Sequence, residues 1–219
     1  MIRAAVIGLL LALALPAEAA PGPRSRKVGA TVTLGGNQFR IWGSVKTGLM
    51  PKGVSIAPDG KTLYVTNFGR KGRDSLSVIR TAPLRFVRHV SFPGNAIESV
   101  VGPTGRFLYT TNYYGSRVTV WDTRTWKPAL SLKPGTFPKM MAIATDGPVL
   151  YTTQWSSGTL AAVSIATGKV LWTLRTGRHP RGISVSPDGK RVYVANAGGR
   201  TVAVVDTRAR RVVGRIRTS

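Results

Sequence analysis

The residue types that carry acid–base or metal chemistry are scarce in this chain. Its 219 residues include eight acidic side chains, two histidines and no cysteine. A hydrolytic pair needs two carboxylates with separated pKa values, and a metal site needs three or four converging ligands. A chain without cysteine also lacks thiol nucleophiles, thiolate metal ligands and covalent haem attachment. We therefore expect no catalytic residue, no metal site, no cofactor and no enzymatic activity.

Most of the acidic residues recur at two fixed places in a repeated pattern. The first place holds Asp59, Asp146 and Asp188, and the second holds Asp122 and Asp206. Asp at such places is typical of turns, where the carboxylate accepts hydrogen bonds from its own backbone.

Four chemically relevant residues fall outside that pattern: Asp74, Glu98, His89 and His179. The two histidines lie in different segments. Glu98 is expected at the start of an innermost strand, where it faces the mouth of a channel. One such carboxyl group with no converging second one predicts a non-catalytic role.

The pattern itself is a fourfold internal repeat. The first copy reads Pro58-Asp-Gly-Lys-Thr-Leu-Tyr-Val-Thr-Asn67, and later copies begin at Pro103, Thr145 and Pro187. The shared tyrosines, which are Tyr64, Tyr109, Tyr151 and Tyr193, are 45, 42 and 42 residues apart. A period of about 40–50 residues with strand-like content predicts an all-β fold, a β-propeller with one four-stranded blade per repeat. We expect the four tyrosines to be buried at equivalent places.

Each repeat reads as four short strands. The first strand, such as 54–57 or 183–186, alternates apolar and polar residues and leads to an Asp-Gly turn. The second strand, such as 63–66, is followed by a variable glycine-rich loop. The third strand, such as 76–79 or 202–205, ends in a polar turn before the fourth.

The hairpin Pro-Asp-Gly-Lys…Tyr-Val-Thr-Asn, followed by a Val-x-Val-x-Asp-Thr strand end, resembles the YVTN family of β-propeller repeats. The resemblance covers residues 30–219. It implies a propeller in which the C-terminal strands usually close the ring with N-terminal ones. Some members of this family are lactonases, others bind haem or quinone-linked partners, and DNA binding occurs within it.

The N-terminal end of the repeats predicts half a blade. Thr31 to Gly48 aligns without a gap on Leu160 to Gly177, so the array begins with a third and a fourth strand. Four full repeats and this half blade leave three alternatives open. They are a five-bladed ring that lacks a hairpin, a truncated product, or a half that associates with another chain through its open blade edges.

The first residues predict export. Residues 1–19 resemble a signal peptide, with Arg3, an apolar stretch and Ala17-Glu-Ala19 as the cleavage site. Residues 20–29 are assigned to a polar linker. A periplasmic or secreted bacterial location follows, with no stable membrane span after cleavage.

The chain is strongly basic, with a formal net charge of +24. A field of that sign favours polyanionic partners such as nucleic acid. The alternative is a solvated basic surface without a ligand, because the charge is spread through every repeat.

Cations and aromatic residues are predicted to share one face, near the start of the innermost strands and in the loops after the second strands. The strand positions are Lys52, Lys139 and Arg181, and the loop positions are Phe68, Tyr113, Tyr114, Trp155 and Arg200. Such a mixture suits single-stranded nucleic acid, because bases stack on rings while cations follow the phosphates. The same mixture also suits a protein partner. The alternative without a ligand is that the cations project into water and each ring packs on its own blade. The predicted function is a non-enzymatic binding scaffold; the alternatives are a single-stranded DNA-binding protein and a lactonase-like hydrolase.

Overall fold

The computed structural model describes residues 29, 31–34, 36–69, 75–145 and 147–218. The predicted signal segment, the linker up to residue 28, Asp74 and Asp146 lie outside these residues. The chain divides into two compact units, Met1–Ser44 and Val45–Ser219. The described residues contain no helix of the length and apolarity that a membrane span requires.

The N-terminal unit contains one hairpin. Strand β1 (Thr31–Leu34) pairs with β2 (Asn37–Arg40), and Leu34 lies opposite Asn37. The connection is therefore two residues long, and Gly36 has a φ of 80° in the left-handed region. Glycine adopts this region without strain, which allows so short a turn. Strand β1 lies where the alignment on the third repeat predicts a strand. The second strand is displaced, because the alignment places it at residues 41–46, whereas β2 ends at Arg40 and residues 41–47 are not in a strand.

The larger unit consists of four antiparallel four-stranded sheets that follow one another along the chain. The first sheet comprises β3 (Pro51–Ile56), β4 (Thr62–Asn67), β5 (Leu76–Thr81) and β6 (Leu84–Val90). The second comprises β7 (Ala96–Val101), β8 (Phe107–Asn112), β9 (Arg117–Asp122) and β10 (Pro128–Leu132). The third comprises β11 (Pro138–Ile143), β12 (Val149–Gln154), β13 (Thr159–Ser164) and β14 (Val170–Arg175). The fourth comprises β15 (Pro180–Val185), β16 (Arg191–Asn196), β17 (Thr201–Asp206) and β18 (Arg211–Arg217).

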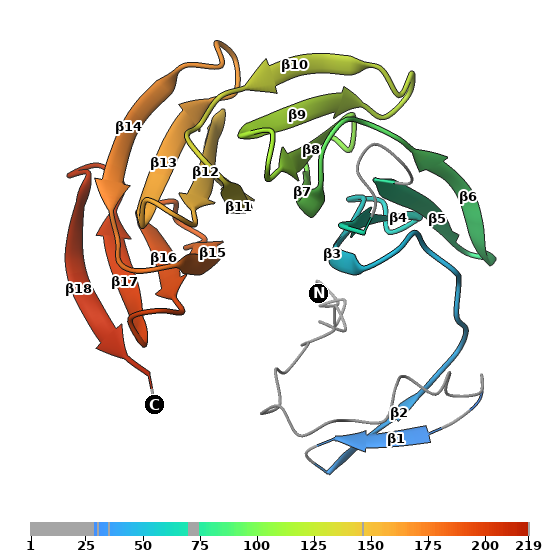
Figure 1. The fold of residues 1–219 in the computed structure, drawn as a ribbon. Helices are drawn as coiled ribbons and strands as arrows, with labels where there is room; N and C mark the ends of the chain where they lie inside the picture. The colour runs from blue at the N-terminus through green and yellow to red at the C-terminus, as the bar shows by residue number, and fades with distance from the viewer. Residues whose placement is uncertain (1–28, 30, 35, 70–74, 146, 219) are drawn as a thin grey trace. The chain divides into compact units, whose positions relative to one another are not determined.

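This arrangement confirms the predicted all-β fold of four-stranded blades. Within the larger unit, the first strands of the sheets, β3, β7, β11 and β15, lie on the inner side (Figure 1). The fourth strands, β6, β10, β14 and β18, lie on the outer side (Figure 1).

The buried apolar clusters lie between neighbouring sheets. Tyr64 packs with Leu108 and Trp121 of the second sheet, and Tyr109 packs with Leu150 of the third. In the same way, Tyr151 packs against the fourth sheet. Each cluster joins the face of one sheet to that of the next, as expected of packed propeller blades.

The expectation of four equivalent buried tyrosines is wrong for the last repeat. Tyr64, Tyr109 and Tyr151 are 4–5% exposed, whereas Tyr193 is 37% exposed. The cause is packing, because no further sheet among the described residues of Val45–Ser219 covers the side of β16 that carries Tyr193.

The recurring aspartates that the structure describes lie in turns or at the strand ends that lead into turns, as predicted. Asp59 and Asp188 each accept a hydrogen bond from the backbone N–H two residues later, at 2.9 and 3.0 Å. Asp122 does the same with the N–H of Arg124 at 2.9 Å. This bond is the main reason why the pKa of Asp122 is lowered. These carboxylates therefore shape the hairpins.

Candidate functional site

Each innermost strand contains a β-bulge near its start, and the bulges position the predicted cations. Pro51 pairs with Asn67 and Gly53 with Thr66, so Lys52 has no partner across the ladder. Arg181 is the extra residue of β15 in the same way. In β7 and β11 the irregular stretches are Ile97–Glu98 and Lys139–Met140. A bulge re-aims the side chain that it carries, so the three cations leave the regular alternation of their strands.

A buried threonine of the second strand holds each of the first three bulges. The Thr66 hydroxyl accepts the N–H of Gly53 at 2.9 Å and donates to the Ile97 carbonyl of the next sheet at 2.7 Å. The Thr111 hydroxyl accepts the N–H of Glu98 at 2.9 Å and lies 3.5 Å from the Lys139 carbonyl. These bonds connect neighbouring sheets and fix the bulges relative to one another.

Lys139 interacts electrostatically with the other two predicted cations, Lys52 and Arg181. The pKa of Lys139 is lowered to about 8, first by burial and then by the charges of Arg181 and Lys52. The ion pairs among the described residues are Arg106–Asp122, Asp188–Lys190 and Arg191–Asp206, so none of them neutralises this group. Like charges held together without a counter-charge favour the binding of an anion.

Aromatic side chains from two neighbouring sheets gather beside the cations. Tyr113 and Tyr114, in the loop after β8, have ring centroids 5.1 Å apart. Phe68, in the loop after β4, lies 6.4 Å from Tyr113, and the Lys52 ammonium is 5.7 Å from the Phe68 ring. Phe137, which the sequence interpretation missed, lies 5.1 Å from Tyr113. Tyr114 is the most exposed of the group, at 56%.

A second aromatic group lies at the third and fourth sheets. The Lys139 ammonium is 3.4 Å from the centre of the Trp155 ring. The ring of His179 stacks on Trp155 with a centroid distance of 4.7 Å and an interplanar angle of 14°. His179 is exposed and was interpreted from sequence as an isolated histidine. We call Lys52, Phe68, Tyr113, Tyr114, Phe137, Lys139, Trp155, His179 and Arg181 the basic-aromatic face.

Phe137 and His179 reach this face because of an unusual backbone conformation. Both precede the proline that begins an innermost strand, and their φ angles are 51° and 50°. Met50 occupies the same place before β3, with a φ of 53°. Bulky side chains rarely adopt the left-handed region, so these residues carry strain that the surrounding structure must support.

Two residues from the sequence analysis have a different environment. Arg200 is exposed in the turn between β16 and β17, and no contact joins it to the other cations in the described structure. His89 lies in β6, where it contacts the Ser77 hydroxyl at 3.2 Å and packs on Phe86. Neither residue belongs to the basic-aromatic face.

Glu98 is half-buried in the bulge of β7, and burial raises its pKa to about 7. The N–H of Ser99 acts in the opposite direction and lowers the pKa. The described residues contain no cluster of three or more His, Asp or Glu side chains that could hold a metal ion. A single carboxyl group that titrates near neutrality is therefore the chemically distinctive group beside the face.

The amide side chains at the ends of the second strands are structural. Asn112 donates from Nδ2 to the Pro93 carbonyl and accepts the N–H of Gly115 at 2.9 Å. Asn196 exchanges hydrogen bonds with Thr176, and Gln154 is buried. These side chains tie loops to their sheets and are not presented to a ligand.

Four-stranded sheets in series, packed face to face, define a protein of the β-propeller class, and solved propeller-like structures resemble the chain. Hydrazine synthase of Kuenenia stuttgartiensis has a TM-score of 0.69 and 24% identity, over 78% of this chain and 50% of that chain. A candidate 6-phosphogluconolactonase of Bacteroides uniformis has a TM-score of 0.67 and 16% identity, over 84% and 61% of the two chains. A candidate 6-phosphogluconolactonase of Bacteroides fragilis has a TM-score of 0.65 and 18% identity, over 77% of this chain and 55% of that chain. At these identities the likeness shows the fold alone.

Comparison with known sequences matches a smaller share of the chain. Antigen Lp49 of Leptospira interrogans is 26% identical over 102 residues, which are 45% of this chain and 22% of Lp49. This chain thus spans less than a quarter of that relative. No protein-family profile matches the chain.

Proposed function

We propose that this chain is a YVTN-type β-propeller repeat protein that acts outside the cytoplasm as a non-enzymatic binding scaffold. Its basic-aromatic face takes an anionic ligand. The proposal rests on one observation, the convergence of Lys52, Lys139 and Arg181: after burial, the charges of Arg181 and Lys52 lower the pKa of Lys139. Such a cluster lowers the stability of the free protein, and an anion relieves the repulsion when it binds.

The aromatic side chains of the basic-aromatic face indicate which kind of anion binds. Phe68 lies beside Lys52, with Tyr114 next to it, and these rings offer apolar surfaces on which flat groups can stack. Trp155 is contacted by Lys139 and by the stacked ring of His179, so a base would stack there in place of His179. Rings interleaved with cations bind single-stranded nucleic acid without sequence preference. A polyanion with unpaired bases therefore matches this face better than a duplex, whose bases are already stacked.

The test is a binding titration with a short oligothymidylate at about 50 and 200 mM salt. Three phosphate contacts to a single strand reduce the affinity about 20-fold over this range by counterion release. Lys139→Met should weaken binding at the lower salt concentration, while the exposed Lys169→Met serves as a control for net charge. Equal losses from the two variants, or affinity that does not respond to salt, would contradict the proposal.

A second candidate function is lactone hydrolysis, and Glu98 is the observation that favours it. A carboxyl group with a pKa near 7 can act as a general acid or base at neutral pH. Two solved structures with this fold are described as candidate 6-phosphogluconolactonases. A screen of lactones with and without divalent metal tests this function. Turnover that falls by orders of magnitude in a folded Glu98→Gln variant would replace the scaffold proposal with an enzyme.

A further inference from the structure

A groove lies at the opposite ends of the strands, between the first and second sheets. Its volume is about 650 Å³. The turn after β3, strands β4 to β6 and the turns after β7 and β9 line it. None of these residues belongs to the basic-aromatic face, so the groove is a separate feature of the molecule.

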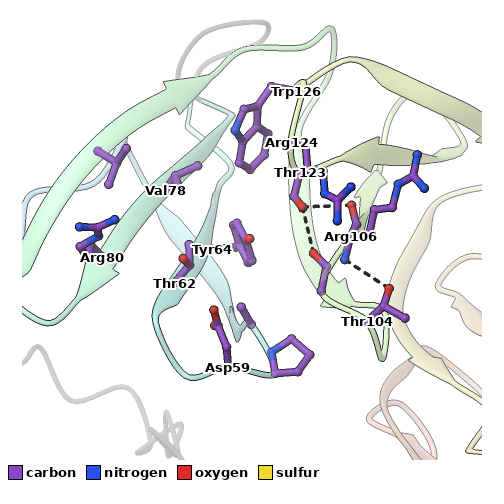
Figure 2. Close-up of a pocket in the computed structure, with 14 residues that line it drawn as sticks. Asp59, Thr62, Tyr64, Val78, Arg80, Thr104, Arg106, Thr123, Arg124 and Trp126 are labelled. Carbon is purple, nitrogen blue, oxygen red and sulfur yellow. Dashed lines mark hydrogen bonds between the residues drawn. The ribbon is translucent and has the colours of Figure 1, made fainter.

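Two aromatic side chains, one from each sheet, line the groove. Tyr64 lies at its base, and the rings of Tyr64 and Trp126 meet edge to face at 5.9 Å and 61°. Figure 2 shows Trp126, Tyr64 and Asp59 in a row along the groove, with Arg80 to one side. Rings in this arrangement give a flat group a surface to pack on.

Trp126 holds this place despite an unfavourable backbone. Its φ is 55°, and its N–H donates to the Asp122 carbonyl at 2.8 Å. The equivalent residue of the third sheet is Gly168, with a φ of 71°. A left-handed conformation costs a non-glycine residue about 1–2 kcal/mol. The fourth sheet carries Arg210 at this place, with a φ of 53°, so the turn itself imposes the left-handed conformation and only the side chain of Trp126 is particular to the second sheet.

Arg80 is a second departure from the repeat. It lies opposite Thr62 in the ladder, at the place where the other sheets carry Asp122, Ser164 and Asp206. In the second and fourth sheets this place holds the carboxylate that accepts the N–H groups of the turn. The first sheet therefore has a cation lining the groove where a turn-forming carboxylate is usual.

The groove carries an excess of positive charge. Its lining includes Arg80 from the first sheet, Arg106 and Arg124 from the second, and one carboxylate, Asp59. Arg106 is paired with Asp122 at 3.2 Å, whereas Arg80 and Arg124 have no acidic partner among the described residues. The Thr123 hydroxyl donates to the carbonyls of Gly105 and Arg106 at 2.9 and 3.0 Å, which fixes the second wall (Figure 2).

The corresponding groove between the third and fourth sheets lacks this combination. Its volume is about 360 Å³, and its arginines, Arg208 and Arg210, both come from the fourth sheet. That groove also contains an aromatic pair, Tyr151 and Trp172, whose ring centroids are 5.8 Å apart, so an aromatic pair is common to both grooves. The first groove differs because its arginines come from both sheets. The difference arises from side chains, since the repeat supplies the same backbone in both places.

We propose that the groove between the first and second sheets binds a small anion that carries a flat ring, as a mononucleotide or an aromatic carboxylate does. Arg80 and Arg124 bind the anionic group from the two walls, because guanidinium groups match the geometry of phosphate and carboxylate. The half-buried Trp126 contacts the ring of the ligand, and the buried Tyr64 supports Trp126 from behind. Asp59 lines the same groove and supplies an acceptor for a hydroxyl group.

The experiment is a calorimetric titration of the full chain with adenosine monophosphate, 4-hydroxybenzoate, adenosine and inorganic phosphate. We expect at least one of the two ring-bearing anions to bind at least about tenfold more tightly than adenosine or phosphate. Arg80→Ser, which installs the residue of the third sheet, should weaken that binding about tenfold or more. The matched control is Arg208→Ala in the other groove, which should leave the affinity unchanged.

Trp126→Gly provides an independent readout, because glycine suits the left-handed backbone and should preserve the fold. It should remove the advantage of the ring-bearing anions over phosphate. Lys139→Met should have no effect, which separates this groove from the basic-aromatic face. Two results would overturn the proposal: no binding of either ring-bearing anion at about 10 mM, or equal affinity in wild type and Arg80→Ser.

Discussion

The ammonium group of Lys139 lies 3.4 Å from the centre of the Trp155 ring, and like charges from Lys52 and Arg181 act on it. The cation–π contact stabilises the charged form of the lysine, while burial and the two cations oppose it. Burial, followed by the charges of Arg181 and Lys52, lowers the pKa of Lys139. The environment of Lys139 therefore destabilises the free protein, and a bound anion would relieve the repulsion.

Substitution of Lys139 should separate binding from stability. Lys139→Met removes the repelled charge and keeps an unbranched side chain that can pack on the Trp155 ring. We expect the melting temperature at pH 7 to rise by a few degrees, which corresponds to about 1 kcal/mol, while anion affinity falls. Thermal unfolding and oligothymidylate titration measure the two effects. A destabilised variant with unchanged affinity would make Lys139 a structural residue.

Anion binding should weaken as the pH rises. Lys139 is charged below its pKa of about 8 and neutral above it, and Glu98 becomes negative as the pH passes about 7. Both changes reduce the positive charge near the face, so affinity should be highest below pH 7 and fall towards pH 9. Lys139→Arg, whose guanidinium stays protonated, should keep affinity at the alkaline end. A profile that is flat from pH 6 to pH 9 would exclude titration of these groups during binding.

Trp155 should contribute through stacking if single-stranded nucleic acid is the ligand. Trp155→Ala should weaken oligothymidylate binding by about 1–3 kcal/mol and duplex binding much less. His179→Ala is a useful comparison, because this substitution uncovers one side of the Trp155 indole and leaves the indole in place. Equal losses of affinity for single-stranded and duplex DNA would show that no base stacks on Trp155 and that binding rests on general charge attraction. No loss on either would assign Trp155 to packing between the sheets.

The tyrosines of the repeat should differ in their contribution to stability. Tyr109 is 4% exposed and packs between the second and third sheets. Tyr109→Ala should therefore lower the free energy of unfolding by about 3–5 kcal/mol. Tyr193→Ala, on the uncovered side of the fourth sheet, should lower it by less than about 1 kcal/mol. Chemical denaturation of the two variants makes the comparison, and equal losses would show that Tyr193 is buried in solution.

The repeat was sufficient to predict the sheets, because hydrophobic alternation and Asp-Gly turns are local signals. Strands β4, β8, β12 and β16 lie where the Tyr-Val-Thr-Asn copies predict them. The exposure of Tyr193 was not predictable in this way, since burial depends on the neighbouring sheet rather than on the strand that carries the tyrosine.

The basic-aromatic face was predictable only in part. The alignment of repeats placed Lys52, Lys139 and Arg181 at equivalent positions, and the structure brings them within electrostatic range of each other. Phe137 and His179 were missed because their φ angles, near 50°, direct the rings to the loop of the preceding sheet. A usable signal existed: both residues directly precede the proline at the start of an innermost strand.

The location of the apolar clusters between sheets has a consequence for how the larger unit opens. A sheet that shares its core with two neighbours can detach only if both interfaces break, whereas the first and fourth sheets each share a core with one neighbour among the described sheets of the larger unit. Stability in such a linear array is a sum of nearest-neighbour terms. Amide hydrogen exchange should therefore be slowest in β8 and β12 and faster in β3 to β6 and in β15 to β18. Local unfolding would then begin at an end sheet, so Phe68 and Arg181 would lose their places before the middle sheets open.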